Sequence, residues 1–454
     1  MKTKLIDIPR MSQKEQQKKY PGIMTHTEFI RKRDFPLLDR ADRVYLDSGA
    51  TSQEPQSVKD KIHQYRSTHI RGSNHSENSA EAKEAQMQIE NVRDNLQNFF
   101  GAYDYSVSLT SGTTASSIAV ASRFNFHKND ILLLSESEHN SQILSPRNFA
   151  GEAGAKVLYI PVDSEGRLDL DFVRNLVAKN PDGYILLFLA HASNVTGIVH
   201  PVQEIRQILR DSDFIYLDMA QSAGHIPISL DDLGVDFAGV SAHKMYGPFG
   251  TGALFVHPSA ERRLGDRVSG GSAVHWVSKG NESMMDLPER LEPGTQNIEG
   301  AIEWGYALDY LKHIGMAKIE AHDRELGRYF VGELEKINST KGPVHIYGPK
   351  TFEDRIAVVT FNIGREDSKN FALVAQKLDQ MDISVRDGCF CAHILMAKLV
   401  ANGYFEEDEK PGAVRASFSF YNDLNDAYKA VKAIDDLVGL YLEGRLKKSG
   451  GCNC

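Results

Sequence analysis

The chain contains little cysteine and has no long apolar run. Four cysteines in 454 residues are too few for a disulfide-rich scaffold. No stretch approaches the ~18 apolar residues that a membrane helix needs, and the first residues lack the apolar centre of a secretory signal. These absences argue against a disulfide-stapled extracellular module and a transmembrane protein, and they predict a cytoplasmic location.

Concentrated positive charge is also missing. The net charge is −9 at pH 7, and acidic and basic residues are interspersed along the chain. Nucleic-acid binding generally requires a basic patch or stripe, so neither a nucleic acid nor a membrane is an expected partner. Internal repeats are absent as well.

The length exceeds what one small core needs and favours a large domain with a smaller one. We predict an amino-terminal arm over 1–40, packed against the small domain, and a large cofactor-binding domain over 41–310. A small carboxy-terminal domain over 311–446 and a flexible, cysteine-containing tail over 447–454 complete the chain. The pattern over 299–337 predicts a long helical stretch.

Short apolar segments alternate with helical patterns through the middle of the chain. Strands are expected at 107–110, 131–134, 157–160, 184–189, 214–217, 237–240 and 253–256. Strands that are apolar throughout and alternate with helices predict an α/β fold with a mainly parallel sheet covered on both faces. Ligands bind at the carboxyl ends of such strands. Polar residues follow the expected strands there, at Gly112–Thr114, His139, Asn194, Asp218, Gln221 and Lys244.

Common nucleotide-binding signatures are absent, since no Walker lysine and no Gly-X-Gly-X-X-Gly after a strand occur. Gly112-Thr113-Thr114 instead connects an expected strand to an expected helix. Free backbone N–H groups, the helix dipole and two hydroxyls favour a phosphate at this point. An ordinary helix N-cap is the alternative interpretation.

Lys244 follows the apolar run 237–240 and lies between His243 and a glycine-rich turn. A desolvated lysine loses its charge readily and can form a Schiff base with a carbonyl. Asp218 ends the preceding strand, and an acid there can keep a pyridine nitrogen protonated, which strengthens pyridoxal phosphate as an electron sink. His139 also follows a strand and is a candidate for stacking on a cofactor ring and for proton transfer.

Together these residues resemble those of class V pyridoxal-phosphate enzymes of the aminotransferase superfamily, most closely cysteine desulfurases of the SufS/NifS type. The resemblance extends from about residue 28 to 440. The matching stretches are 45–52, 110–114, 138–139, 193–197, 218–221, 241–244, 294–297, 386–392 and 414–417. It implies the fold-type-I architecture and pyridoxal 5'-phosphate as the cofactor.

The resemblance also implies roles for the cofactor-binding residues. Lys244 would hold the cofactor as a Schiff base and move protons. Asp218 would pair with the pyridine nitrogen, Gln221 would lie near the ring hydroxyl, and His139 would stack on the ring. The phosphate would be held by Thr113, Thr114, Ser241 and His243, and by Thr295 from the other subunit of a homodimer.

Further implied roles concern the substrate, L-cysteine or a related amino acid. Asn194, Arg386 and Arg415 would face its carboxylate, which an arginine fork binds in a bidentate manner. Cys391 lies where the family keeps its persulfide-forming cysteine, which passes sulfur to an acceptor protein. The resulting prediction is a cysteine desulfurase that releases alanine.

The cysteine loop departs from the SufS-like pattern. Cys389 and Phe390 replace two histidines, and Ile394 replaces a proline. The Gly-Cys-Phe-Cys run also resembles the desulfurase-like domain of molybdenum-cofactor sulfurases, but their large carboxy-terminal extension is missing. Cys389 is a candidate resolving thiol, and Cys452 and Cys454 in the tail are candidate sulfur acceptors or an unused terminus. Cys-X-Cys is not the usual zinc spacing, so no metal is predicted.

Two other kinds of function stay open. One group keeps the fold but not the sulfur transfer and comprises a cysteine carbon–sulfur lyase, a selenocysteine lyase and an aminotransferase or epimerase-like enzyme. Another possibility is a non-catalytic sulfur carrier or scaffold. The set of Lys244, Asp218 and His139 argues against that last function.

Overall fold

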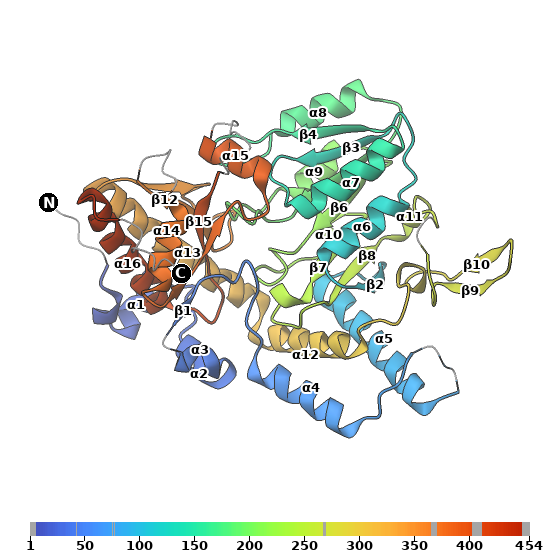
Figure 1. Cartoon of the computed structure of the whole chain (residues 1–454), viewed down its shortest axis with the longest axis horizontal. Coiled ribbons are helices and arrows are strands. Elements are labelled where there is room, and N and C mark those ends of the chain that lie inside the picture. Colours follow the sequence, from blue (N-terminus) through green and yellow to red (C-terminus); the bar gives the residue numbers. More distant parts are fainter. Residues whose placement is uncertain are drawn as a thin grey trace, which may run out of the picture.

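The computed structural model describes residues 6–41, 43–74, 76, 78–266, 269–364, 370–401 and 411–446 (Figure 1). The predicted tail with Cys452 and Cys454 lies outside these residues. Every helix in the described part is too short or too polar to cross a membrane. The predicted domain boundaries stay predictions.

A seven-stranded sheet forms the centre of the larger part of the molecule (Figure 1). Its strands, in spatial order, are β2 (Ser106–Thr110), β8 (Gly252–Val256), β7 (Phe237–Ser241), β6 (Phe214–Asp218), β5 (Ile185–Ala190), β3 (Ile131–Ser135) and β4 (Lys156–Ile160). Neighbouring strands from β7 to β4 run parallel, and β8 is antiparallel to both β2 and β7. The prediction of an α/β fold with a mainly parallel sheet is confirmed.

Helices cover both faces of this sheet because its strands are apolar on both sides. Leu132 packs with Val120 and Ile143 on the face covered by α6 and α7. Leu133, the next residue of β3, packs with Val173 on the opposite face. The first face carries α6 (Thr113–Arg123), α7 (Asn140–Glu152) and α11 (Pro258–Glu261). The second carries α5 (Ala80–Phe100), α8 (Leu170–Lys179), α9 (Val202–Ile208), α10 (Leu230–Leu233) and α12 (Ile298–Ile314), with α4 (Gln56–Thr68) beside α12.

A second, antiparallel sheet lies in the carboxy-terminal part (Figure 1). Its order is β11 (Val344–Tyr347), β12 (Val358–Ile363), β15 (Ala413–Ser417) and β14 (Arg386–Gly388). Three helices pack with it, namely α13 (Met316–Thr340), α14 (Phe371–Asp379) and α16 (Leu424–Leu442). Helix α15 (His393–Ala401) follows the cysteine loop.

The amino-terminal residues pack against this second core. Ile8 and Tyr20 are buried in the same cluster as Phe330 of α13 and Val431 of α16. Strand β1 (Val44–Tyr45) pairs in parallel with β13 (Ile383–Ser384). Short helices α1 (Gln13–Lys19), α2 (Thr27–Asp34) and α3 (Pro36–Arg40) precede β1.

The long helical stretch predicted over 299–337 is confirmed, with one interruption. Two helices, α12 and α13, occupy this stretch and are separated by Gly315. Gly315 has a φ of 94°, a conformation that L residues with side chains rarely adopt and that ends a helix. The hairpin of β9 (Val274–Val277) and β10 (Glu282–Met284) projects from the large part (Figure 1).

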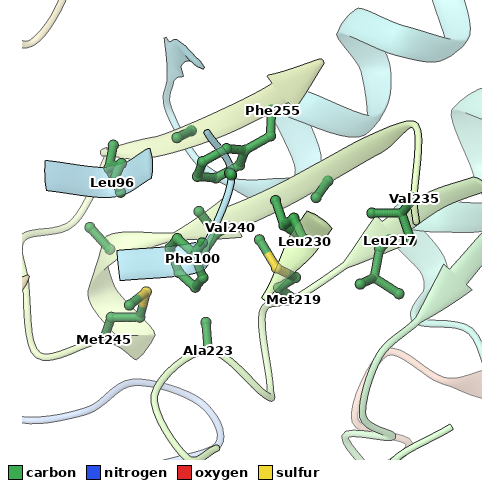
Figure 2. Close-up of a cluster of buried hydrophobic side chains, with 14 of the residues drawn as sticks. Leu96, Phe100, Leu217, Met219, Ala223, Leu230, Val235, Val240, Met245 and Phe255 are labelled. Carbon is green, nitrogen blue, oxygen red and sulfur yellow. The ribbon is translucent and has the colours of Figure 1, made fainter. Parts of the chain in front are cut away.

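A buried apolar cluster supports the strand ends that carry Asp218 and Lys244. Met219 and Met245, their neighbours in the chain, lie in this cluster with Phe100 (Figure 2). Both methionine side chains are fully buried. Because these neighbours are held in the core, Asp218 and Lys244 have fixed positions at the edge of the sheet.

Candidate active site

A cavity of about 470 Å³ lies at the carboxyl ends of the parallel strands. Every predicted cofactor-binding and substrate-binding residue except Thr295 lines it, and so does Cys391. The predicted residues in its wall are Thr113, Thr114, His139, Asn194, Asp218, Gln221, Ser241, His243, Lys244, Arg386, Cys391 and Arg415. Asp218 and Ser241 belong to the large sheet and Arg386 and Arg415 to the second sheet, so the cavity lies between the two parts of the chain.

One end of the cavity is the amino terminus of helix α6. Gly112 is the N-cap residue and has no side chain to cap the helix, and Thr114 is exposed to the cavity. Thr113 donates its backbone N–H to Ser241 Oγ at 2.8 Å, and the two hydroxyl oxygens are also 2.8 Å apart. The helix dipole and the remaining N–H groups of the first turn make this end suitable for an anion.

Asp218 is the last residue of β6 and is buried. Its Oδ1 accepts the backbone N–H of Ala220 at 2.8 Å. Burial raises the pKa of Asp218, while the Ala220 hydrogen bond and the charge of Lys244 act in the opposite direction. A buried carboxyl that faces the cavity is a suitable acceptor for a protonated ring nitrogen.

Lys244 ends the short helical turn η2 (Ala242–Lys244) that follows β7. Burial lowers the pKa of its amine to about 8, and the carboxylate of Asp218 partly offsets this effect. A substantial fraction of the amine is therefore neutral near physiological pH. That form is the nucleophile that Schiff-base chemistry requires.

His139 is the N-cap residue of α7, and its Nδ1 accepts the backbone N–H of Ser141 at 3.2 Å. The ring proton therefore belongs on Nε2. Burial, followed by the charges of Lys244 and Arg415, lowers the pKa of His139 to about 4. The ring is neutral at pH 7, as stacking on a cationic heterocycle requires.

The side chains of Gln221 and His243 are held by contacts that the sequence did not predict. Gln221 donates its amide N–H to the backbone oxygen of Gly49 at 2.7 Å. His243 Nδ1 lies 3.3 Å from Thr51 Oγ1, and its ring stacks on Phe249 with centroids 5.5 Å apart. Burial lowers the pKa of His243 to about 4, so this ring is also neutral at pH 7.

These residues fit pyridoxal phosphate. The amino terminus of α6, with Thr113, Thr114 and Ser241, matches a phosphate, and Asp218 matches the pyridine nitrogen. Lys244 has the lowered pKa that a cofactor-linking lysine needs. The donor set thus suits the phosphate, the ring and the aldehyde of one molecule.

Arg415 and Arg386 line the same cavity. Arg415 on β15 is buried and donates from Nη1 to the backbone oxygen of Asn194 at 3.1 Å and from Nη2 to Asp47 Oδ1 at 3.2 Å. Arg386 on β14 is more exposed, with its Nη1 3.8 Å from Asp47 Oδ2. Burial lowers the pKa of Arg415, an effect that Asp47 opposes.

Cys391 is exposed and lines the cavity, whereas Cys389 does not line it. The Cys389 thiol donates to the backbone oxygen of Pro411 at 2.7 Å. Phe390 and Cys391 have φ values of 53° and 56°. Asn194 Nδ2 donates to the Phe390 backbone oxygen at 2.7 Å, and Asn140 donates its N–H to the Cys391 backbone oxygen at 2.6 Å. These bonds hold the unusual backbone that directs only one of the two cysteines to the cavity.

Thr295 is exposed and lies in a different hollow, of about 300 Å³, with Tyr65 and Arg71. The single chain therefore does not bring Thr295 to its own cavity.

Sequence reasoning assigned no role to Asp47, Phe390 or Phe249, all of which line the cavity. A signal for Asp47 was available, since it is a polar residue directly after a strand, as Asp218 is. No sequence signal pointed to Phe249 or Phe390, because aromatic residues are common in surface loops.

A model of the aminotransferase class-V family matches residues 44–429 of the chain. Curated relatives include a cysteine desulfurase of Haloferax volcanii, 31% identical over 428 residues that cover 88% of this chain and 95% of the relative. A cysteine desulfurase of Yersinia pseudotuberculosis is 31% identical over 420 residues, covering 89% of this chain and 98% of the relative.

Solved structures agree with the sequence relatives. The cysteine desulfurase of Thermococcus onnurineus superimposes with a TM-score of 0.80 at 30% identity, covering 91% of this chain and 98% of that one. The cysteine desulfurase CsdA of Escherichia coli gives a TM-score of 0.77 at 26% identity, with coverage of 91% and 98%.

Proposed function

The chain belongs to the aminotransferase class-V family, and on that premise we propose that it is a cysteine desulfurase. It would convert L-cysteine to L-alanine and hold the sulfur as a persulfide on Cys391. Pyridoxal phosphate is the cofactor of this family, and when bound it withdraws electrons from the substrate and weakens the carbon–sulfur bond.

One observation supports the proposal above the others: Cys391 is exposed in the cavity that also contains Lys244 and Arg415. A thiol that accepts sulfur must reach the substrate and then present the persulfide to an acceptor, so it must be accessible. Cys391 meets both needs. The similarity to proteins described as cysteine desulfurases supports the same reaction.

The chain's own residues divide the remaining work. Arg415 and Arg386 bind the substrate carboxylate, with Asn194 fixing the orientation of Arg415 through its backbone oxygen. Lys244, with its pKa lowered to about 8, accepts and returns protons without a large energetic cost. The neutral ring of His139 donates from Nε2 and keeps the reacting groups in place.

A homodimer and a sulfur-acceptor protein are part of the proposal. Thr295 would reach the phosphate of a second copy, which agrees with its exposed position away from its own cavity. The acceptor would approach the exposed thiol of Cys391. A cytoplasmic location stays a prediction from the sequence.

The test is incubation of the purified holoenzyme with L-cysteine, with and without a reductant, while alanine, pyruvate and sulfide are quantified. We expect alanine from the native protein, and a loss of at least about a hundredfold in Cys391→Ser, since the nucleophile is removed. Cys389→Ser is the matched control and should still form alanine with reductant present, because that thiol does not line the cavity.

The products distinguish the alternatives. Pyruvate with ammonia would indicate a cysteine lyase. Equal alanine formation by the native protein and by Cys391→Ser would indicate a selenocysteine lyase or another class-V reaction. Absence of the absorption of a lysine-bound cofactor would favour a non-catalytic carrier.

A further inference from the structure

Two arginines of the cavity face each other directly across a strand pair. Arg386 on β14 and Arg415 on β15 are opposite partners in the antiparallel ladder. Like charges directly opposite on neighbouring strands repel each other. Since Arg415 is buried, water screens this repulsion poorly, and a nearby negative charge is needed.

Asp47 provides that charge. Its Oδ1 is 3.2 Å from Arg415 Nη2, and its Oδ2 is 3.8 Å from Arg386 Nη1. The side chain of Asp47 is 15% exposed and lines the cavity with both arginines. One carboxylate therefore contacts both guanidinium groups at the place where a substrate carboxylate would bind.

The turn that follows β1 fixes the position of Asp47. Its backbone oxygen accepts the N–H of Ala50 at 3.0 Å, and residue 47 forms an isolated bridge with Ser417, two residues beyond Arg415. Tyr45 Oη donates to the backbone oxygen of Thr51 at 2.9 Å and closes the same turn. These bonds fix the backbone of Asp47, and the two arginines hold its carboxylate.

The charges at this end of the cavity can be counted. Arg386 and Arg415 contribute two positive charges and Asp47 one negative charge, which leaves one positive charge for a ligand. Lys244 is also within electrostatic range of Asp47, but in the proposed function it is committed to the cofactor. Each guanidinium still has unused N–H donors, so a ligand carboxylate can bind.

We propose that Asp47 sets the charge selectivity of the cavity, so that it accepts an acid with one carboxylate and discriminates against a ligand with a second anionic group. This inference rests on the proposed function, in which Arg386 and Arg415 bind the substrate carboxylate. Asp47 is a selectivity residue that acts through the two arginines.

The experiment compares propionate with malonate, which has the same number of carbons and a second carboxylate. Dissociation constants are measured by calorimetry with the holoenzyme at pH 7.5, and the malonate preference is the propionate constant divided by the malonate constant. Asp47→Asn should raise this preference about tenfold, because one negative charge near the ligand is lost. Arg386→Gln should lower it by a similar factor.

The double variant Asp47→Asn/Arg386→Gln restores a single positive charge and should return the preference to about the native value. Asp379→Asn is the control, since Asp379 pairs with Arg43 beside the same strand β1 but outside the cavity. An unchanged preference in Asp47→Asn, or a double variant that does not return, would overturn the proposal. Loss of binding of both acids in Asp47→Asn would also overturn it and would indicate that Asp47 only orients Arg415.

Folding problems do not remove the test. If Asp47→Asn fails to fold, Arg386→Gln at its more exposed position still must lower the malonate preference, and an unchanged value refutes the charge count. Neither acid undergoes carbon–sulfur cleavage, so a failed desulfurase assay leaves this measurement valid. A failed measurement equally leaves the desulfurase assay valid.

Discussion

Gly252 is the position where a single methyl group should damage the cofactor site most directly. It is the first residue of β8 and lies between the ends of two strands, opposite Thr110 of β2 and Ser241 of β7. A Cβ built there would contact the backbone oxygen of Val240 too closely and would lie 2.6 Å from Gly112 Cα and 2.9 Å from Gly112 N. Ordinary contact begins at 3.4 Å.

The required displacement follows from these distances. Relief of the contact with Gly112 Cα needs a movement of about 3.4 − 2.6 = 0.8 Å by backbone atoms on one side or the other. Gly112 is the N-cap residue of α6, so its movement also shifts Thr113 and Thr114. Overpacking of this kind costs about 1–3 kcal/mol, and loss of one hydrogen bond to a charged group costs about 1.5–3 kcal/mol.

We therefore expect Gly252→Ala to lower the melting temperature of the cofactor-free protein by about one to three degrees and to weaken pyridoxal phosphate binding by at least about tenfold. Thermal unfolding and titration with the cofactor, followed by absorbance, measure the two effects. Gly439→Ala is the matched control, because a Cβ at this position in α16 meets nothing within 4 Å. Native cofactor affinity in Gly252→Ala would refute the reasoning.

Two further predictions concern the same cavity. The stability of the cofactor-free protein should rise with pH between about 8 and 10.5. Folding lowers the pKa of Lys244 from 10.5 to about 8, so the unfolded chain binds more protons in this window. Thermal unfolding measured against pH should show a smaller rise in Lys244→Met, and identical pH profiles for the two proteins would contradict the prediction. Phe390→Ala should raise KM for cysteine about two- to fivefold, with a smaller effect on kcat. The Arg415 guanidinium lies 5.1 Å from the Phe390 ring centroid, and the variant loses this cation–π contact, worth about 0.5–1 kcal/mol. Steady-state kinetics test this prediction, and an unchanged KM would show that the contact does not orient Arg415.

Local sequence patterns predicted much of the fold. Apolar runs of four to six residues predicted the strands because both faces of the large sheet are covered, and α16 begins and ends where its periodicity indicated, at Leu424 and Leu442. The helix break at Gly315 was missed, since apolar periodicity continues through it. One glycine with a positive φ was enough to end the helix.

The sequence by itself determined which side chains follow the strands, and thus that Lys244 and Asp218 meet at one edge of the sheet. This is a local property, because parallel strands end at a common edge. Only the tertiary structure decided that Asp47 contacts both Arg386 and Arg415, since each arginine is more than 300 positions from Asp47 in the chain. The tertiary structure also decided that Cys391 and not Cys389 lines the cavity, because hydrogen bonds from Asn194 and Asn140 fix the backbone between them. Such contacts depend on how distant segments pack, and no local pattern encodes them.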